Sequence, residues 1–275
     1  MLADVATLLR CPACHGELWV EASVVRCQQG HQFDVSRQGY VNLLGTAQPA
    51  SADTAAMVQA RAQFLAGGHY LPLARAVCAA VGAGEGPVVE LGSGTAYYLA
   101  EVLQQRPQSV RMAIDVSVPA CRRAAKAHPR IGAVVADAWG KVPVMDRCAD
   151  VVLVVFAPRR GAEIARVLRP GGRLVVLTPA ADHLGELVEP LGLLGVDQRK
   201  DERLRAGLEP WLVVREAVSV RFSLSLDATD VEHLAAMGPS AFHSTAAERQ
   251  RRVAALTLPT TVTASVTVTT LCARP

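Results

Sequence analysis

The chain has 275 residues, of which 51% are hydrophobic and 19% charged, and its formal net charge at pH 7 is +3. This composition excludes a disordered, collagen-like or coiled-coil chain and predicts a globular protein with one main core and a smaller attached unit. No apolar run approaches the roughly 20 residues that cross a bilayer, and the first residues lack the pattern of a signal peptide. We therefore expect a cytoplasmic protein without a membrane span.

Four residues near the amino terminus have the spacing of a zinc site. Cys11, Cys14, Cys27 and His31 form a C-x2-C-x12-C-x3-H pattern, with a turn-forming proline or glycine in each close pair. Thiolate and imidazole ligands suit zinc, and four protein ligands leave no position for a reactive water, so we predict a structural site. His15 competes as the fourth ligand, but it directly follows Cys14, whereas His31 completes the second knuckle. Buried cysteines without metal are the alternative.

Composition and spacing divide the chain into three parts. Short strand-like segments at 18–20 and 24–26 surround the cysteines and are too small to fold without an ion. Small and turn-forming residues over 45–52 mark a boundary, and a helical pattern follows them. We therefore assign a zinc ribbon to residues 1–44, a linker and helical segment to residues 45–80, and a larger domain to residues 81–275.

The larger domain has the pattern of an α/β fold. Short apolar segments alternate with helical stretches, which is typical of a parallel sheet with helices on both faces. The predicted strands are residues 88–91, 110–115, 133–136, 150–156, 173–178, 212–222 and 260–271. In the last of them threonine and valine alternate with a period of two, which predicts a half-buried strand lying antiparallel on the sheet. The expected fold class is a doubly wound, Rossmann-like, mostly parallel sheet with an antiparallel last strand.

A glycine loop follows the first strand of this domain. Glu90 lies near the end of the strand, and Gly92 and Gly94 precede a helical stretch over 96–105, so the backbone can approach a ligand closely. A dinucleotide site needs a small residue where Tyr97 stands, which disfavours NAD. An acidic residue before the two glycines instead favours a cationic cofactor without phosphates, such as S-adenosylmethionine (SAM). Glu90 would then lie near its amino-acid end.

Two acidic residues after the next strands extend this candidate cofactor site. Asp115 lies about 20 residues after the glycines, where a carboxylate can accept hydrogen bonds from both ribose hydroxyls. Asp137 and Ala138 follow the third strand, and the Asp137 carboxylate could meet the adenine amino group while apolar atoms pack on the ring. The alternatives are an acid at a helix start for Asp115 and a surface turn for Asp137.

Several segments outside the glycine loop resemble the bacterial 23S rRNA guanine-N1 methyltransferases, and they extend over nearly the whole chain. The segments are GHQFD (30–34), QGYVNLL (38–44), GHY (68–70), FAP (156–158), LRPGG (168–172), DHL (182–184) and MGP (237–239). The last one is similar to the branch of the family that confers macrolide resistance. These motifs are more distinctive than two glycines in a loop.

The resemblance implies a SAM-dependent enzyme that methylates N1 of a guanine in a hairpin loop of 23S rRNA, with macrolide resistance as the outcome. It implies that residues 1–44 bind zinc and recognise RNA, and that residues 45–80 cover the cofactor cleft. It further implies that Tyr70, Gly94, Thr95 and His183 contact the methyl donor. On local sequence alone, Tyr70 and His183 would both be read as structural residues.

The sequence assigns no general base for the attack by guanine N1. In this fold the substrate meets the methyl group beyond the fourth strand, so Phe156 could stack on a base, although a core role is an alternative. Asp137, Asp182 and His183 are candidates through their expected nearness to the cleft. Arginines that could contact RNA phosphates, or simply form solvated faces, are Arg122, Arg123, Arg130, Arg159, Arg160, Arg166, Arg169 and Arg173.

Two other functions are compatible with the sequence. One is a SAM-dependent methyltransferase acting on a small molecule, which would leave the zinc ribbon without a role. The other is a non-catalytic RNA-binding protein whose zinc ribbon grips a hairpin. Methyl transfer that depends on RNA would distinguish these functions from the first. A 23S rRNA hairpin is the expected partner, and a homodimer is left open.

Overall fold

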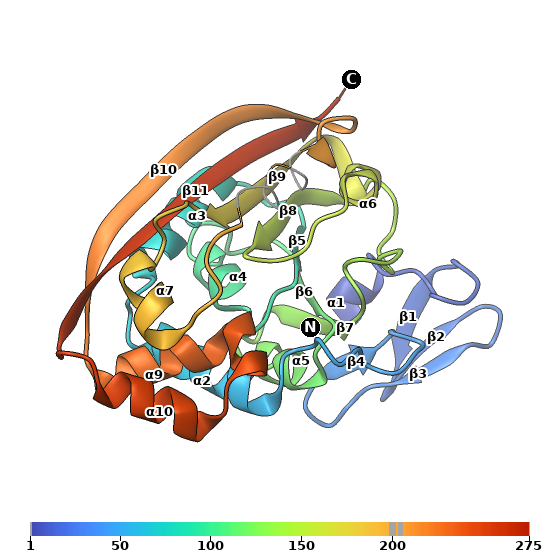
Figure 1. Ribbon diagram of the computed structural model, residues 1–275. Coiled ribbons are helices and arrows are strands. Elements are labelled where there is room, and N and C mark those ends of the chain that lie inside the picture. Colours follow the sequence, from blue (N-terminus) through green and yellow to red (C-terminus); the bar gives the residue numbers. More distant parts are fainter. Residues whose placement is uncertain (1, 198–201, 203–205, 275) are drawn as a thin grey trace.

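The computed structural model describes residues 2–197, 202 and 206–274 (Figure 1). The chain begins with helix α1 (Leu2–Ala6), which is followed by a small antiparallel sheet with the strand order β1-β2-β3. Its strands are β1 (Leu18–Glu21), β2 (Val24–Cys27) and β3 (Gln32–Asp34). In Figure 1 this small sheet projects to one side of the main sheet, next to β7 and α1.

The main sheet has eight strands in the order β10-β11-β9-β8-β5-β6-β7-β4. The strands are β4 (Tyr40–Asn42), β5 (Val88–Leu91), β6 (Arg111–Asp115), β7 (Ile131–Val135), β8 (Ala149–Val155), β9 (Leu168–Pro179), β10 (Leu212–Leu226) and β11 (Thr260–Ala273). Neighbouring strands from β4 to β9 pair in parallel, whereas β11 is antiparallel to both β9 and β10. The predicted fold class, including the antiparallel last strand, is confirmed.

Helices cover both faces of this sheet, and further helices form a layer beside it (Figure 1). They are α2 (Ala55–Ala66), α3 (Leu71–Val81), α4 (Tyr97–Val102), α5 (Val118–Ala124), α6 (Gly161–Val167), α7 (Gly185–Leu191), α9 (Ala228–Met237) and α10 (Ala246–Ala254), with a 3-10 turn at Pro239–His243. Helix α2 starts where the sequence predicted a helix, because the Thr54 side chain accepts a hydrogen bond from the amide of Met57. Helices α2, α9 and α10 make up the additional layer beside the sheet (Figure 1).

The central strands are largely apolar because the helices bury them on both sides. Every residue of β5, β7 and β8 is buried. One hydrophobic cluster contains Leu99 and Leu153, and a second, built around Met112, also contains Leu18 and Val25 of the small sheet. The small sheet therefore shares its core with the main sheet.

The segment after the small sheet returns to the main sheet. Strand β4 pairs in parallel with β7, with Tyr40 opposite Ala133, and forms its outer strand. Helix α1 packs on the same sheet, because Val5 fills the space above Gly132: a Cβ at that glycine would lie 2.4 Å from Val5 Cγ2. Elements of the main fold therefore flank the small sheet on both sides in the chain.

Two local predictions need correction. The helix expected over 96–105 is α4, Tyr97–Val102; Ala96 has a φ of +57° and caps the helix instead of starting it. The strand expected to end at residue 222 continues to Leu226 and forms a long ribbon with β11. Over the described ranges, no single helix is long and apolar enough to cross a membrane. Helices α2 and α3 taken together have the length and composition of a span, but the chain bends by 87° between them.

Candidate functional site

The four predicted zinc ligands come together in the small sheet. The ligand atoms of Cys11, Cys14, Cys27 and His31 all lie within 4.8 Å of one another. Cys27 Sγ is 3.6 Å from Cys14 Sγ and 3.2 Å from His31 Nδ1. A tetrahedral zinc ion with thiolates at about 2.3 Å requires sulfur atoms about 3.8 Å apart, so the cluster fits the ion. His15 is exposed and lies outside the cluster.

The glycine loop turns sharply between β5 and α4. Gly92 has a φ of +68°, and a Cβ at this position would lie 2.4 Å from the Cβ of Ala157, which follows β8. The amides of Gly92 and Ser93 both donate to the Ile114 carbonyl, at 2.8 and 3.0 Å. The loop therefore runs against the ends of β6 and β8, and only glycine allows this close approach.

Asp115 connects this loop to the next strand. Its Oδ2 accepts a hydrogen bond from the Gly94 amide at 2.8 Å, and its Oδ1 accepts one from the Ser117 amide at 2.8 Å. Burial raises the pKa of Asp115 above its usual range, while these two amides oppose the shift. Each carboxylate oxygen keeps a second lone pair, so Asp115 can still accept hydrogen bonds from a ligand.

Buried polar atoms without partners surround the loop. Within the described residues, Glu90 Oε2, Ser93 Oγ and the Tyr98 hydroxyl are buried and make no hydrogen bond. Burial, with Asp115 nearby, raises the pKa of Glu90 well above its usual range, and a cation bound beside the carboxyl would favour its ionised form. Such orphaned groups are costly unless a ligand satisfies them, and a sulfonium amino acid with hydroxyls fits this donor and acceptor set.

Three aromatic rings meet beside the loop. The centroids of Tyr70 and Phe156 are 6.4 Å apart, those of Phe156 and His183 are 5.7 Å apart, and those of Tyr70 and His183 are 6.2 Å apart. Phe156 directly follows β8 with a φ of +52° and is 43% exposed, so it is not a core residue. We call Tyr70, Phe156 and His183 the ring cluster.

The hydrogen bonds of His183 define its tautomer. The Ser265 amide donates to His183 Nδ1 at 3.1 Å, so the proton of the neutral ring is on Nε2, which faces the Tyr70 hydroxyl at 3.4 Å. Burial lowers the pKa of His183 to about 4. The ring is therefore neutral at physiological pH, and it orients the Tyr70 hydroxyl.

This buried neutral histidine makes stability depend on pH. The unfolded chain takes up a proton on His183 as the pH falls below 6.5, whereas the folded chain does so only near pH 4. The contribution of the neutral His183 to stability is therefore fully present above pH 6.5 and is lost as the pH falls towards 4. Between pH 7 and 5, the free energy of unfolding should decrease by about 2 kcal/mol more in the wild type than in His183→Gln. Urea unfolding at both pH values measures this, and equal losses would contradict it.

Asp137 and Ala138 lie apart from the ring cluster, on the loop after β7. Asp137 Oδ1 accepts a hydrogen bond from the Trp139 amide at 2.8 Å, which is a turn contact. Asp137 also lines a cavity of about 390 Å3 that Pro12 of the zinc knuckle and Lys141 border. An adenine-binding role for Asp137 and Ala138 stays a prediction.

Asp182 has a partner outside the site. Its carboxylate forms an exposed ion pair with Arg221 of β10 at 3.0 Å, and hydrogen bonds with Ser265 and Arg221 lower its pKa. A carboxylate held ionised by an arginine is a weaker proton acceptor than a free one. Asp182 therefore directly precedes a residue of the ring cluster in the sequence, but its charge is paired with Arg221.

Sequence reasoning missed Arg61. This residue of α2 pairs with Asp53, donates to the Met237 carbonyl at 2.7 Å, and lies against Gly94, where a Cβ would be 3.2 Å from its Nη1. It therefore ties α2 and the end of α9 to the glycine loop. The available signal was that Arg61 is the charged residue of an otherwise uncharged helix.

The fold and this site define a class of enzyme. Residues 88–172 match the family model described as a methyltransferase domain, and residues 9–51 match the zinc-ribbon model described as the RlmA N-terminal region. The complex of the Haloferax volcanii Trm112 methyltransferase activator and a methyltransferase is similar in fold. Its TM-score is 0.55 at 19% identity, covering 82% of this chain and 99% of that one. The protein is a SAM-dependent methyltransferase with a zinc ribbon.

Full-length relatives narrow this class. The chain is 45% identical to the 23S rRNA (guanine(748)-N(1))-methyltransferase of Streptomyces fradiae, with 98% of both chains covered. It is 46% identical to a Micromonospora griseorubida protein named for 23S rRNA guanine-N1 methylation, with 97% of both covered. The chain belongs to the family of 23S rRNA (guanine-N1)-methyltransferases, as the sequence motifs predicted.

Proposed function

We propose that this protein transfers the methyl group of SAM to N1 of one guanine in a hairpin loop of 23S rRNA. The target would correspond to guanine 748, the position in the name of the Streptomyces fradiae relative. The observation that carries the proposal is the exposed ring of Phe156, held by Tyr70 and His183 next to the glycine loop. An exposed aromatic ring at this position can stack on an unpaired base.

The cofactor residues follow from the buried polar groups. When bound, SAM supplies an electrophilic methyl group on a sulfonium. Glu90 would balance the positive charge at the amino-acid end, Asp115 would accept the ribose hydroxyls, and Gly92 and Gly94 would bring backbone amides close. Thr95, which is buried, would add to the loop contacts, and Tyr70 and His183 would close the site. Asp137 and Ala138 remain candidates for the adenine end.

The chain's own contribution to the reaction is chiefly positioning. Guanine N1 carries a proton at neutral pH, and it must lose that proton as the nitrogen attacks in line. The neutral His183 fixes the Tyr70 hydroxyl, and stacking on Phe156 holds the base edge towards the cofactor. Proton acceptance is not assigned to one residue: the low pKa of His183 and the ion pair of Asp182 make both weak bases.

Removal of the Phe156 ring should impair methylation without unfolding the protein. Because the ring is 43% exposed, Phe156→Ala should change the free energy of unfolding by less than about 1 kcal/mol. The rate at saturating SAM should fall about 10- to 100-fold, because base stacking contributes about 1–3 kcal/mol. Methyl transfer to the hairpin and SAM binding by calorimetry measure the two effects separately.

Phe242 provides a matched control for this variant. It is 42% exposed and lies in the 3-10 turn at Pro239–His243, so Phe242→Ala removes an equally exposed ring elsewhere. We expect its methylation rate to stay within a factor of two or so of the wild type. A normal rate in Phe156→Ala, or a tenfold loss of its SAM affinity, would rule out a stacking role.

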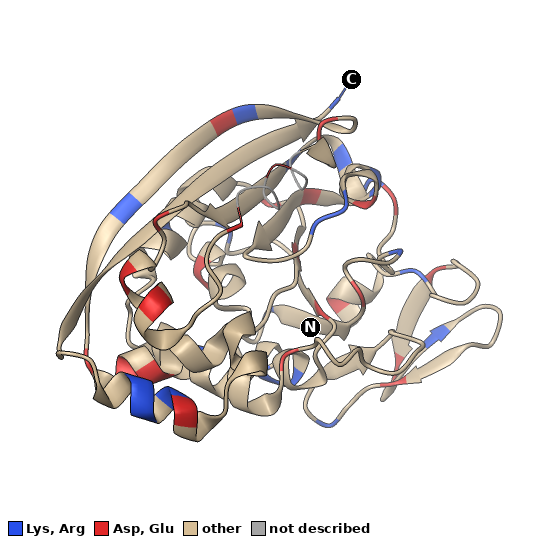
Figure 2. Ribbon diagram, in the orientation of Figure 1, with Lys and Arg blue, Asp and Glu red and all other residues tan. Residues whose placement is uncertain are grey.

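The zinc ribbon would recognise RNA by shape more than by charge. Figure 2 shows residues of both signs on the small sheet, and Arg26 pairs with Glu21 at 3.3 Å. A hairpin loop can splay its bases at modest energetic cost, so a rigid ribbon can select it by geometry. In this proposal residues 1–44 contact RNA, residues 45–80 cover the cofactor, and residues 81–275 carry out the transfer.

Three features of the biology belong to the same proposal. Methylation of the loop would confer macrolide resistance, in line with the resemblance at 237–239, and expression in a sensitive host should raise its drug tolerance. An rRNA substrate also favours action in the cytoplasm. A homodimer remains a prediction that sedimentation at working concentrations tests.

Reverse transcription gives the sharpest test of the proposed reaction. Purified protein is incubated with SAM and unmodified 23S rRNA, and the product is copied by reverse transcriptase. A methyl group on guanine N1 blocks the Watson–Crick edge, so a single stop in one hairpin loop would establish substrate, atom and position. Methyl transfer with full read-through would identify another atom, and no transfer would overturn the proposal.

A further inference from the structure

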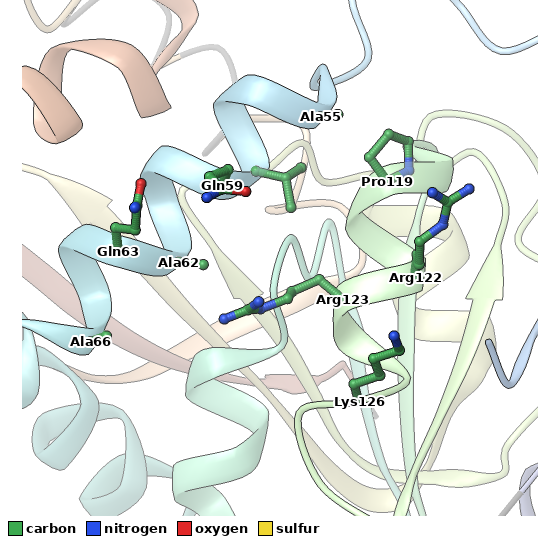
Figure 3. Close-up of a pocket in the computed structure, with 10 residues that line it drawn as sticks. Ala55, Gln59, Ala62, Gln63, Ala66, Pro119, Arg122, Arg123 and Lys126 are labelled. Atoms are coloured by element: carbon green, nitrogen blue, oxygen red, sulfur yellow. The ribbon is translucent and has the colours of Figure 1, made fainter.

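A groove between α2 and α5 carries positive charge outside the cofactor site. It has a volume of about 400 Å3 and is formed by α2 on one side and by α5 with the following turn on the other (Figure 3). Arg122, Arg123 and Lys126 line the α5 side, and Gln59 and Gln63 line the α2 side; all five are exposed. Figure 3 shows the Arg123 side chain extended across the gap towards α2.

The charge of this groove is unbalanced. None of the lining residues is acidic, and its three cations make no ion pair within the described part of the chain. Two of the other arginines with phosphate-binding potential are engaged: Arg166 pairs with Glu163 at 2.8 Å, and Arg169 pairs with Asp150. The whole chain has a formal excess of only +3, so a groove with three free cations is a distinct local feature.

The chemistry of the walls matches a sugar-phosphate backbone. Arginine, lysine and glutamine side chains are the usual partners of phosphate and ribose oxygens. The cores of protein interfaces are instead rich in aromatic residues and methionine, besides arginine, and poor in lysine and alanine. Here the remaining lining residues are small or aliphatic: Ala55, Val58, Ala62, Ala66 and Pro119. Charge and wall composition therefore both favour a nucleic-acid strand over a protein.

Both walls are joined to the cofactor loop. Helix α2 presents Gln59 and Gln63 to the groove and places Arg61 against Gly94. Helix α5 begins after Ser117, whose amide donates to the Asp115 carboxylate that also accepts from the Gly94 amide. The groove therefore lies on the same two helices that border the cofactor, and a strand bound in it would be held beside the reaction.

We propose that the groove between α2 and α5 binds the phosphate backbone of the RNA substrate next to the methylated loop. This inference rests on the proposed function, since it assigns a second contact for the same RNA. Its residues bind and orient substrate and take no part in the chemical step. Their loss should therefore affect RNA affinity and KM, with little change in kcat or SAM binding.

The test removes the three cations together. Arg122→Gln/Arg123→Gln/Lys126→Gln should weaken hairpin binding about tenfold or more at an ionic strength of about 0.15 M. The slope of log affinity against log salt should become shallower by about 2, since each contact to a single strand contributes about 0.7. Fluorescence anisotropy of the labelled hairpin measures both, and calorimetry with SAM confirms that the cofactor site is intact.

Matched variants separate charge from folding. Arg75→Gln/Arg215→Gln/Arg251→Gln removes three exposed cations elsewhere and should leave RNA affinity within about twofold. Arg122→Lys/Arg123→Lys keeps the charge and should restore most of the affinity. From the opposite wall, Gln59→Glu/Gln63→Glu should weaken RNA binding without touching α5.

The outcomes distinguish this inference from the proposed function. If the wild type produces the reverse-transcription stop and the triple variant binds RNA with unchanged affinity and salt slope, the groove inference alone is wrong. If the triple variant binds RNA normally but sediments differently from the wild type, the groove binds a second copy of the chain, and the groove inference is wrong. If the wild type gives no stop, the proposed function fails whatever the groove binds.

Discussion

Replacement of Cys27 with serine is expected to release zinc and unfold β1, β2 and β3, while the main sheet remains folded. Cys27 is buried, and its Sγ lies close to Cys14 Sγ and to His31 Nδ1. The substitution therefore removes one of the four zinc ligands. Structural zinc contributes about 10–16 kcal/mol in peptide-sized domains, which a sheet of this size cannot replace. Metal analysis should give less than about a tenth of an equivalent of zinc.

Hydrogen exchange locates the damage. Amides of residues 18–34 should lose protection, those of β5 to β8 should keep it, and methylation of the hairpin should fall at least about 100-fold with SAM binding retained. Cys272→Ser, which removes a half-buried thiol of β11, should leave zinc and activity unchanged. Loss of protection throughout the chain would contradict a local effect.

A pair of histidine variants tests the fourth ligand. His31→Ala should lose zinc, because its Nδ1 lies in the ligand cluster, whereas His15→Ala should keep a full equivalent. The two residues are close in sequence, and His15 is exposed, so both variants change a similar surface. Zinc retention in His31→Ala would reassign the ligand.

The substitution Gly92→Ala should abolish methylation. A Cβ would lie 2.4 Å from that of Ala157, and the backbone φ of +68° is unfavourable for alanine. We expect a loss of about 2–4 kcal/mol in the free energy of unfolding and a fall of at least about 100-fold in SAM affinity, because the loop must shift. Chemical unfolding and calorimetry with SAM measure these effects.

Gly185→Ala is the control for this substitution. A Cβ on Gly185 would meet nothing within 4 Å, and the residue opens α7 near the ring cluster. Alanine is a better helix residue than glycine, so stability should be equal or slightly higher, by up to about 1 kcal/mol. If Gly92→Ala bound SAM as well as this control does, the close contact with Ala157 would have no role in the cofactor site.

The candidate site divides into residues that spacing could predict and residues that it could not. The zinc ligands and the series Glu90, Gly92 and Asp115 follow from local spacing and from the rule that parallel strands end at one edge. Tyr70 and His183 are 113 positions apart in the chain, and their contact depends on how α3 and α7 dock. Only resemblance to a family predicted them.

The fold shows the same division. Long apolar strands such as β8 were predicted closely, because burial on both faces leaves a continuous apolar run. Strand β4 has three residues among turns, and its pairing with β7 is a tertiary event without a local period. Arg61 was missed for a related reason: its partners, Asp53 and Met237, lie on separate segments.

The return of the chain through β4 has a consequence for building hybrids of related enzymes. A swap of the amino-terminal piece at residue 44 would bring in a foreign outer strand and a foreign α1, both of which contact β7. A swap limited to residues 11–34 would exchange the zinc ligands and the small sheet, and would leave the contacts of β4 and α1 with β7 unchanged. Because we propose that the ribbon recognises the RNA, we expect target preference to be transferred with the shorter piece, whereas the longer piece would give the same change at a loss of stability.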